Sequence, residues 1–232
     1  MLFDLRTGAR RRTVKLVYLG LAFLMFAGFV GFSIGSSGIS GGIIDAITQG
    51  GGGGGNSNDR FTQRVQAADR FAHAHPSDAG AWAALARARF QLAGVGGNYD
   101  SAQNTYTDAG KAQLQKAGDA WDRYLALNPP KPDDRVASLM VQAFSELNKP
   151  AEAVTAQEII TQVRPKAATF AQLAVFAYQA GQTNKGDLAA KKALSLTPKD
   201  QRAALKGQLD QAKSQAAGSA AAAASGGSSG GG

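Results

Sequence analysis

Two stretches of the chain, 135–165 and 168–198, carry one pattern of large and small apolar residues. Aligning Pro165 with Pro198 places the two copies in register, 33 residues apart. The first copy carries Ala137, Met140, Val141, Phe144, Ala153, Gln157 and Ile160. The second carries Phe170, Leu173, Ala174, Gly181, Gly186, Ala190, Ala193 and Leu194. Apolar residues at intervals of three and four are typical of amphipathic helices. The sequence therefore predicts an all-α fold built from repeated helix pairs.

The pattern resembles the tetratricopeptide repeat, a unit of two antiparallel helices with large residues early, small residues at the crossing and a closing proline. Two positions depart from it, because Gln157 stands where the family prefers an aromatic residue and Ala137 where it prefers Trp. The resemblance implies a short α-solenoid of about three helix-pair repeats. With the membrane segment described next, it implies a tetratricopeptide repeat protein of the membrane-anchored bacterial type.

The N-terminal part of the chain has the features of a membrane anchor. Residues 16–34 contain no charged side chain, and a helix of about twenty residues spans the roughly 30 Å of hydrocarbon in a bilayer. The segment 1–15 is basic and only Gly and Ser directly follow the apolar run, which predicts a cytoplasmic N-terminus and an extracytoplasmic remainder. A cleaved signal peptide is the alternative, but the run is long and no Ala-x-Ala site follows. The Gly-rich segment 35–57 is predicted to be a flexible linker with a reach on the order of 25 Å.

The repeat domain is expected to span residues 58–216. Helices are predicted at 59–75, 79–92, 111–128, 133–147, 151–163, 166–180, 184–196 and 199–216. The first and last of these suit capping elements at the two ends of the repeats. Segment 93–110 is too long for a turn within a helix pair and is predicted to be an inserted loop. The Ala/Gly/Ser tail 217–232 has nothing to bury and is predicted to be disordered.

Composition and charge exclude several classes of function. The chain has no cysteine, which removes disulfides, thiolate chemistry and cysteine-held metals. Half of the net charge of +8 lies in residues 1–35, and no aromatic and basic residues interleave as a nucleic-acid platform requires. His73 and His75 belong to no recognised metal-binding motif, and no catalytic motif occurs. We therefore expect neither an enzyme nor a bound cofactor, metal or nucleic acid.

Charge is uneven within the repeat domain. Residues 164–213 hold nine basic and three acidic residues. Such a basic half can dock onto an acidic partner or anionic lipid headgroups, and an ordinary solvated helix face is the alternative.

Two surfaces are candidates for binding a protein or peptide partner. In the tetratricopeptide family, the first helices of the pairs line a concave groove. The resemblance assigns these groove positions to Arg87, Phe90, Gln91, Arg135, Ser138, Gln142, Ser145, Glu146, Val175, Tyr178 and Gln179. The second candidate is the insertion 93–110, where Tyr99 and Tyr106 are possible contact residues.

The sequence therefore favours a membrane-tethered scaffold or adaptor of a bacterial cell envelope, with its helical repeats outside the cytoplasm. Two alternatives stay open. One is an accessory factor of an envelope assembly machine, of the cytochrome maturation or secretion type. The other is a binding protein secreted after signal cleavage.

Overall fold

The computed structural model describes residues 56–226, which belong to one compact unit. The predicted basic segment 1–15, the membrane span 16–34, nearly all of the linker 35–57 and residues 227–232 lie outside the described residues. No helix among residues 56–226 is both long enough and apolar enough to cross a bilayer.

The described residues are almost entirely helical, which confirms the all-α prediction. The helices are α3 (Asn56–Ala74), α4 (Ala79–Ala93), α5 (Asp108–Ala126), α6 (Asp134–Glu146), α7 (Pro150–Val163), α8 (Ala167–Gln179), α9 (Thr183–Leu196) and α10 (Arg202–Gly226). A short 3-10 helix η1 (Gly96–Asn98) and the strands β1 (Tyr99–Asp100) and β2 (Thr105–Tyr106) lie between α4 and α5.

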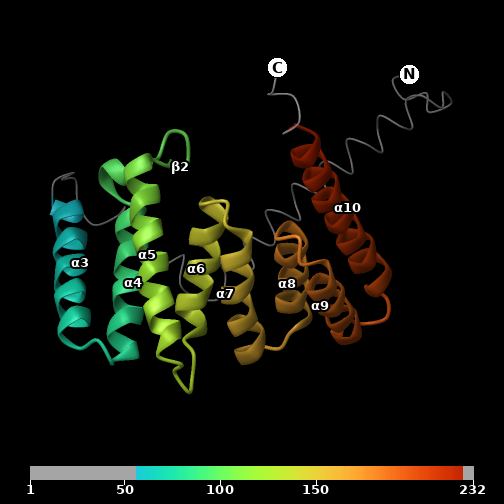
Figure 1. The fold of residues 1–232 in the computed structure, drawn as a ribbon, viewed down its shortest axis with the longest axis horizontal. Coiled ribbons are helices and arrows are strands. Elements are labelled where there is room, and N and C mark those ends of the chain that lie inside the picture. Colours follow the sequence, from blue (N-terminus) through green and yellow to red (C-terminus); the bar gives the residue numbers. More distant parts are fainter. Residues whose placement is uncertain (1–55, 227–232) are drawn as a thin grey trace, which may run out of the picture. The chain divides into compact units, whose positions relative to one another are not determined.

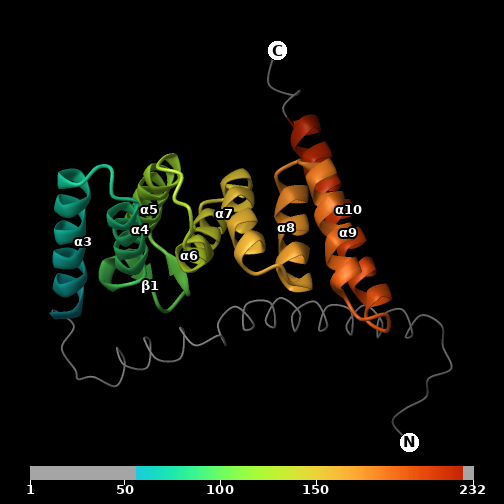
Figure 2. The same ribbon diagram turned by 90° about the horizontal axis from the view of Figure 1, so that it is seen from below.

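Each helix packs against the next one in the chain, as Figures 1 and 2 show. The pairs α4/α5, α6/α7 and α8/α9 form the centre of the array, α3 packs on α4, and α10 packs on both α8 and α9. A further contact joins α4 to α6, the first helices of two successive pairs. Successive helices run in opposite directions, so every second turn lies at the same end of the array (Figure 1).

Local sequence signals explain where the helices begin and turn. Asp78 and Asp133 precede α4 and α6 and accept hydrogen bonds from backbone N–H groups of the first turn, which satisfies donors that have no partner inside the helix. Pro150 opens α7, where its missing N–H costs no hydrogen bond. In two of the turns, Asn148 and Gly181 adopt positive φ angles of 53° and 71°, which Asn and Gly tolerate best.

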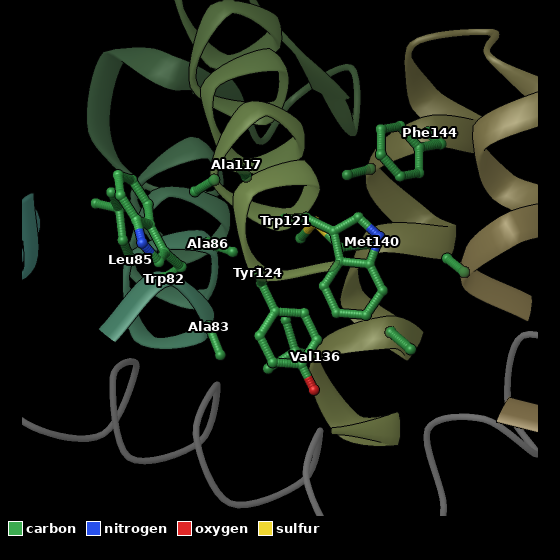
Figure 3. Packing of buried hydrophobic residues seen from close by; sticks show 14 of the residues in the cluster. Trp82, Ala83, Leu85, Ala86, Ala117, Trp121, Tyr124, Val136, Met140 and Phe144 are labelled. Atoms are coloured by element: carbon green, nitrogen blue, oxygen red, sulfur yellow. The ribbon is translucent and has the colours of Figure 1, made fainter. Parts of the chain in front are cut away.

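Small residues let the helices approach one another around a few large rings. Figure 3 shows Trp121 and Tyr124 of α5 near Met140 and Val136 of α6. Trp121 is 1% exposed, and its ring stacks on that of Tyr124 at a centroid distance of 4.9 Å. The main core cluster continues without a break from Ala72 in α3 to Ile160 in α7.

The structure adds detail to one prediction of irregular structure and corrects another. The predicted insertion 93–110 lies between α4 and α5 and contains η1 and the hairpin β1–β2, and α5 begins at Asp108 with Thr107 as its cap. The tail predicted as disordered from residue 217 is helical as far as Gly226. Alanine has the highest intrinsic helix propensity, so the run 220–224 continues α10 although residues 220–222 are exposed.

Candidate partner-binding face

One narrow stripe of α6 faces solvent, and it consists of predicted groove positions. Arg135, Gln142, Ser145 and Glu146 are exposed and Ser138 is half-buried. The opposite side of α6 is buried and holds Val136, Ala137, Met140, Val141, Ala143 and Phe144. The amphipathic pattern of α6 therefore fixes which side chains a partner can reach.

Arg87 of α4 borders the N-terminal end of this stripe. Its Nη2 lies 3.1 Å from Asp133 Oδ2, while Asp133 Oδ1 accepts hydrogen bonds from the N–H groups of Arg135 and Val136. The N–H group of Asp133 in turn donates to the Tyr124 hydroxyl at 2.6 Å. The cap of α6 thus ties together α4, α5 and α6.

The other two α4 positions are less available to a partner. Phe90 is half-buried and packs against the main core cluster. Gln91 is also half-buried, and its Oε1 accepts a hydrogen bond of 3.1 Å from Arg64 in α3. These contacts stabilise the α3–α4 packing, so Arg87 is the α4 residue best placed to meet a ligand.

Ser138 lies beside an ion pair that joins α6 to the end of α7. Arg164 donates from Nη2 to Ser138 Oγ at 3.1 Å, and its Nε lies 2.7 Å from Asp134 Oδ2. The Nε–H is not aligned on the carboxylate as a hydrogen bond, so this contact is an ion pair. Arg164 and Asp134 were not among the predicted site residues; the signal for Asp134 was its place at a helix start, next to Asp133.

The three predicted groove residues of α8 differ in exposure and do not form a continuous exposed stripe like that of α6. Gln179 is exposed and Val175 is half-buried. The groove prediction is wrong for Tyr178, which is only 6% exposed and packs against Gly186 of α9. Its hydroxyl donates to Asp187 Oδ1 at 2.9 Å, and Lys213 of α10 lies 5.8 Å from its ring centre. Tyr178 fills the α8–α9–α10 junction, where a full aromatic side chain can be buried.

Two pKa values report on this junction. Burial, followed by the hydrogen bond to Asp187, raises the pKa of the Tyr178 hydroxyl well above its usual range. The hydrogen bonds from Lys213 and then Tyr178 lower the pKa of Asp187. Lys213 Nζ lies 2.7 Å and 2.8 Å from the two oxygens of that carboxylate.

The hairpin brings the second candidate surface next to the first. Tyr99 and Tyr106 are paired across the two strands, and their rings meet edge to face at 5.1 Å. The Tyr99 hydroxyl donates to Asn104 Oδ1 at 2.5 Å. Tyr106 packs against the main core cluster, and burial, then the charge of Glu146 and then Tyr99, raises its pKa. In Figures 1 and 2 the hairpin lies beside the C-terminal end of α6, which agrees with the effect of the Glu146 charge on Tyr106.

The arrangement offers recognition by hydrogen bonds and charge. We call the exposed stripe of α6 with its two borders the α6 face; it comprises Arg87, Arg135, Ser138, Gln142, Ser145, Glu146 and Tyr106. Within residues 56–226, no three potential ligand residues gather as a metal site would require. A hollow of about 370 Å³ lies elsewhere, at the α8–α9 turn, where its lining is the five residues from Gly181 to Lys185.

Comparison with known proteins adds no identification. No family model matches the chain, and no curated protein sequence matches it.

Proposed function

We propose that this chain is a membrane-tethered scaffold whose helix pairs are degenerate tetratricopeptide-like repeats that bind a segment of another envelope protein outside the cytoplasm. The pairs α4/α5, α6/α7 and α8/α9 support the repeat interpretation, because they follow one another along the array as such repeats do. The uncharged run 16–34 and the basic residues before it support the anchor and its orientation.

One observation carries the binding function: the α6 face is polar, exposed along its centre and bordered at both ends. From Arg135 to Glu146 the stripe covers about 16 Å at 1.5 Å per helical residue. About five residues of an extended peptide cover the same length. Arg135 lies in the first turn of α6, Arg87 of α4 contacts the cap residue Asp133, and Glu146 lies at the other end of α6. The face therefore fits a short polar peptide that places an acidic group near Arg135 and Arg87.

Cross-linking from the centre of the face tests this function. A photo-reactive residue in place of Gln142 in the full chain, in intact cells, is expected to give a discrete adduct with one protein. The matched control carries the same residue in place of Thr155, which is exposed on α7. Replacing Arg135 with Glu is expected to reduce the Gln142 adduct by about tenfold, because a charge-assisted contact is lost. Equal adducts from both positions, unaffected by the Arg135 change, would remove the α6 face from the proposal.

The anchor has its own test. The full chain is expected to stay with the membrane pellet after alkaline carbonate extraction, and its measured mass should still include residues 1–34. A soluble chain that lacks those residues would instead support the secreted alternative.

A further inference from the structure

Exposed apolar side chains are concentrated at one end of the helical array. Five large apolar residues are exposed among the described residues. Four of them lie in the last turn or at the C-terminal cap of a helix: Phe71 in α3, Leu127 after α5, Val163 in α7 and Leu196 in α9. Because these helices alternate in direction with their neighbours, all four ends lie at the same end of the array (Figure 1).

A proline and a lysine follow three of these residues. Pro130 and Lys131 follow Leu127, Pro165 and Lys166 follow Val163, and Pro198 and Lys199 follow Leu196. The turn after Phe71 departs from this rule, because Ser77 follows its proline. We call the repeated set the basic rim; it comprises Leu127, Lys131, Val163, Lys166, Leu196 and Lys199.

The charges of the basic rim are free to meet an external anion. All three lysines are exposed, and none of them forms an ion pair within residues 56–226. The nearby acids Asp133 and Asp134 are already paired, with Arg87 and Arg164 respectively. Asp78 caps α4, whereas Asp200 and Asp122, which lies about one turn before the end of α5, have neither role. The edge therefore presents an excess of positive charge.

We propose that the basic rim docks on a lipid bilayer that carries anionic headgroups. Leucine and valine side chains 36–46% exposed can enter the interfacial region, while neighbouring lysines stay at headgroup level. Lysines close to an anionic membrane surface are attracted to it, and salt screens this attraction. A row of similar turns along one edge matches an extended surface better than a pocket.

The basic rim is a different surface from the α6 face and adds a second contact with the membrane. An anchor at 16–34 leaves residues 35–55 between the bilayer and α3. If they form the predicted tether, their reach is on the order of 25 Å. This distance keeps the domain at a high local concentration near the lipid, where weak contacts suffice to orient it.

Single-cysteine labelling of the full chain tests the docking directly, because the chain has no cysteine of its own. One probe replaces Gln162, which is exposed in the last turn of α7 beside the basic rim. The control probe replaces Asn184, which is exposed in the first turn of α9 at the opposite end of the array. Both labelled chains are reconstituted into vesicles of phosphatidylcholine alone, or of phosphatidylcholine and phosphatidylglycerol in equal parts, with a quencher on the lipid headgroup.

We expect quenching of the Gln162 probe in the anionic vesicles at low salt, loss of this quenching at high salt, and little quenching of the Asn184 probe. Each lysine near an anionic surface increases the ratio of docked to free domain by a factor of about five. The variant with Lys131→Glu, Lys166→Glu and Lys199→Glu should therefore lower the docked-to-free ratio by roughly a hundredfold or more. Because these side chains are exposed, its circular dichroism and melting should match the parent.

Three outcomes would overturn the docking. One is equal quenching of the two probes. Another is Gln162 quenching that is the same in neutral and anionic vesicles. The third is the absence of Gln162 quenching in both vesicles, which is the result expected if an acidic protein occupies the basic rim. Flotation distinguishes a failure of the anchor, because a chain that docks but is not inserted floats only with anionic vesicles at low salt.

Discussion

The ring of Tyr178 lies against Gly186 so closely that α9 has no room for a Cβ atom at this position. The ring cannot easily move, because its hydroxyl is hydrogen-bonded to Asp187 and Lys213 lies over its face. This contact is where α8, α9 and α10 join.

We expect Gly186→Ala to destabilise the protein. Overpacking a tight contact costs about 1–3 kcal/mol, and the higher helix propensity of alanine offsets about 1 kcal/mol of that cost. The measurement is urea unfolding of the full chain in detergent, followed by helical circular dichroism.

Gly207 provides the matched control, because it lies within α10 and a Cβ added there would meet no atom within 4 Å. Gly207→Ala should stabilise the protein by up to about 1 kcal/mol. If both substitutions stabilise it equally, the Tyr178–Gly186 contact is not as tight as described.

The same junction should respond to acid. The pKa of Asp187 is lowered in the folded state by Lys213 and Tyr178, so around that pKa the unfolded state binds more protons. Its contribution to stability is present above the unfolded pKa of about 3.9 and is lost as pH falls through the lower folded value. The stability difference between the parent and Asp187→Asn should therefore be larger at pH 7 than at pH 3.

Urea unfolding at both pH values gives this difference, with Asp200→Asn as a control for losing an exposed carboxylate in the same part of the chain. A difference that does not change with pH would mean that the Asp187 charge does not stabilise the junction.

Periodicity in the sequence located every α-helix of the described residues but could not determine which face of α8 carries an aromatic ring into the core. Tyr178 and Ala177 are neighbours, and a shift of one residue rotates a side chain by about 100° around the helix. The resemblance placed Tyr178 in the groove, whereas Tyr178 and Ala177 are both buried. Gly186 belongs to the repeated pattern as a small residue, but only the folded structure shows that it is the Tyr178 ring that lies against it.

The ion pairs between distant residues and the C-terminal end of α10 could not be predicted from the sequence for a different reason. The Arg87–Asp133 and Arg164–Asp134 pairs join residues that are 46 and 30 positions apart, and no local pattern encodes such a contact. The end of α10 was predicted to be disordered because it has no apolar surface to bury. The high helix propensity of alanine nevertheless extends the helix as far as Gly226. The hairpin was missed because its strands are two residues long, too short for an alternating pattern.

Asp133 is expected to matter more as a cap than as an ion-pair partner. Asp133→Ala removes both roles and should cost about 1–2 kcal/mol, as for other N-caps. Arg87→Ala removes only an ion pair between side chains that are 44% and 35% exposed, which should cost less than about 1 kcal/mol. Asp133→Asn keeps a capping oxygen and should lie close to Arg87→Ala.

Urea unfolding of the single variants and of the double variant Arg87→Ala/Asp133→Ala gives the coupling between the two side chains. A coupling energy as large as the whole cost of Asp133→Ala would show that the ion pair, and not the cap, dominates.

Gln157 is a polar side chain that is only 1% exposed, at a position where the tetratricopeptide pattern prefers an aromatic residue. Its Nε2 donates to the backbone oxygen of Thr169 at 2.9 Å and joins α7 to the first turn of α8, while its Oε1 has no partner. Gln157→Ala should cost about 2–4 kcal/mol, because it leaves a cavity. Gln157→Met fills the same space without the buried, unpaired oxygen, so it should be neutral or stabilising within about 1 kcal/mol. If Gln157→Met costs as much as Gln157→Ala in urea unfolding, the hydrogen bond to Thr169 outweighs the unpaired oxygen, and a polar residue is required to hold α8 against α7.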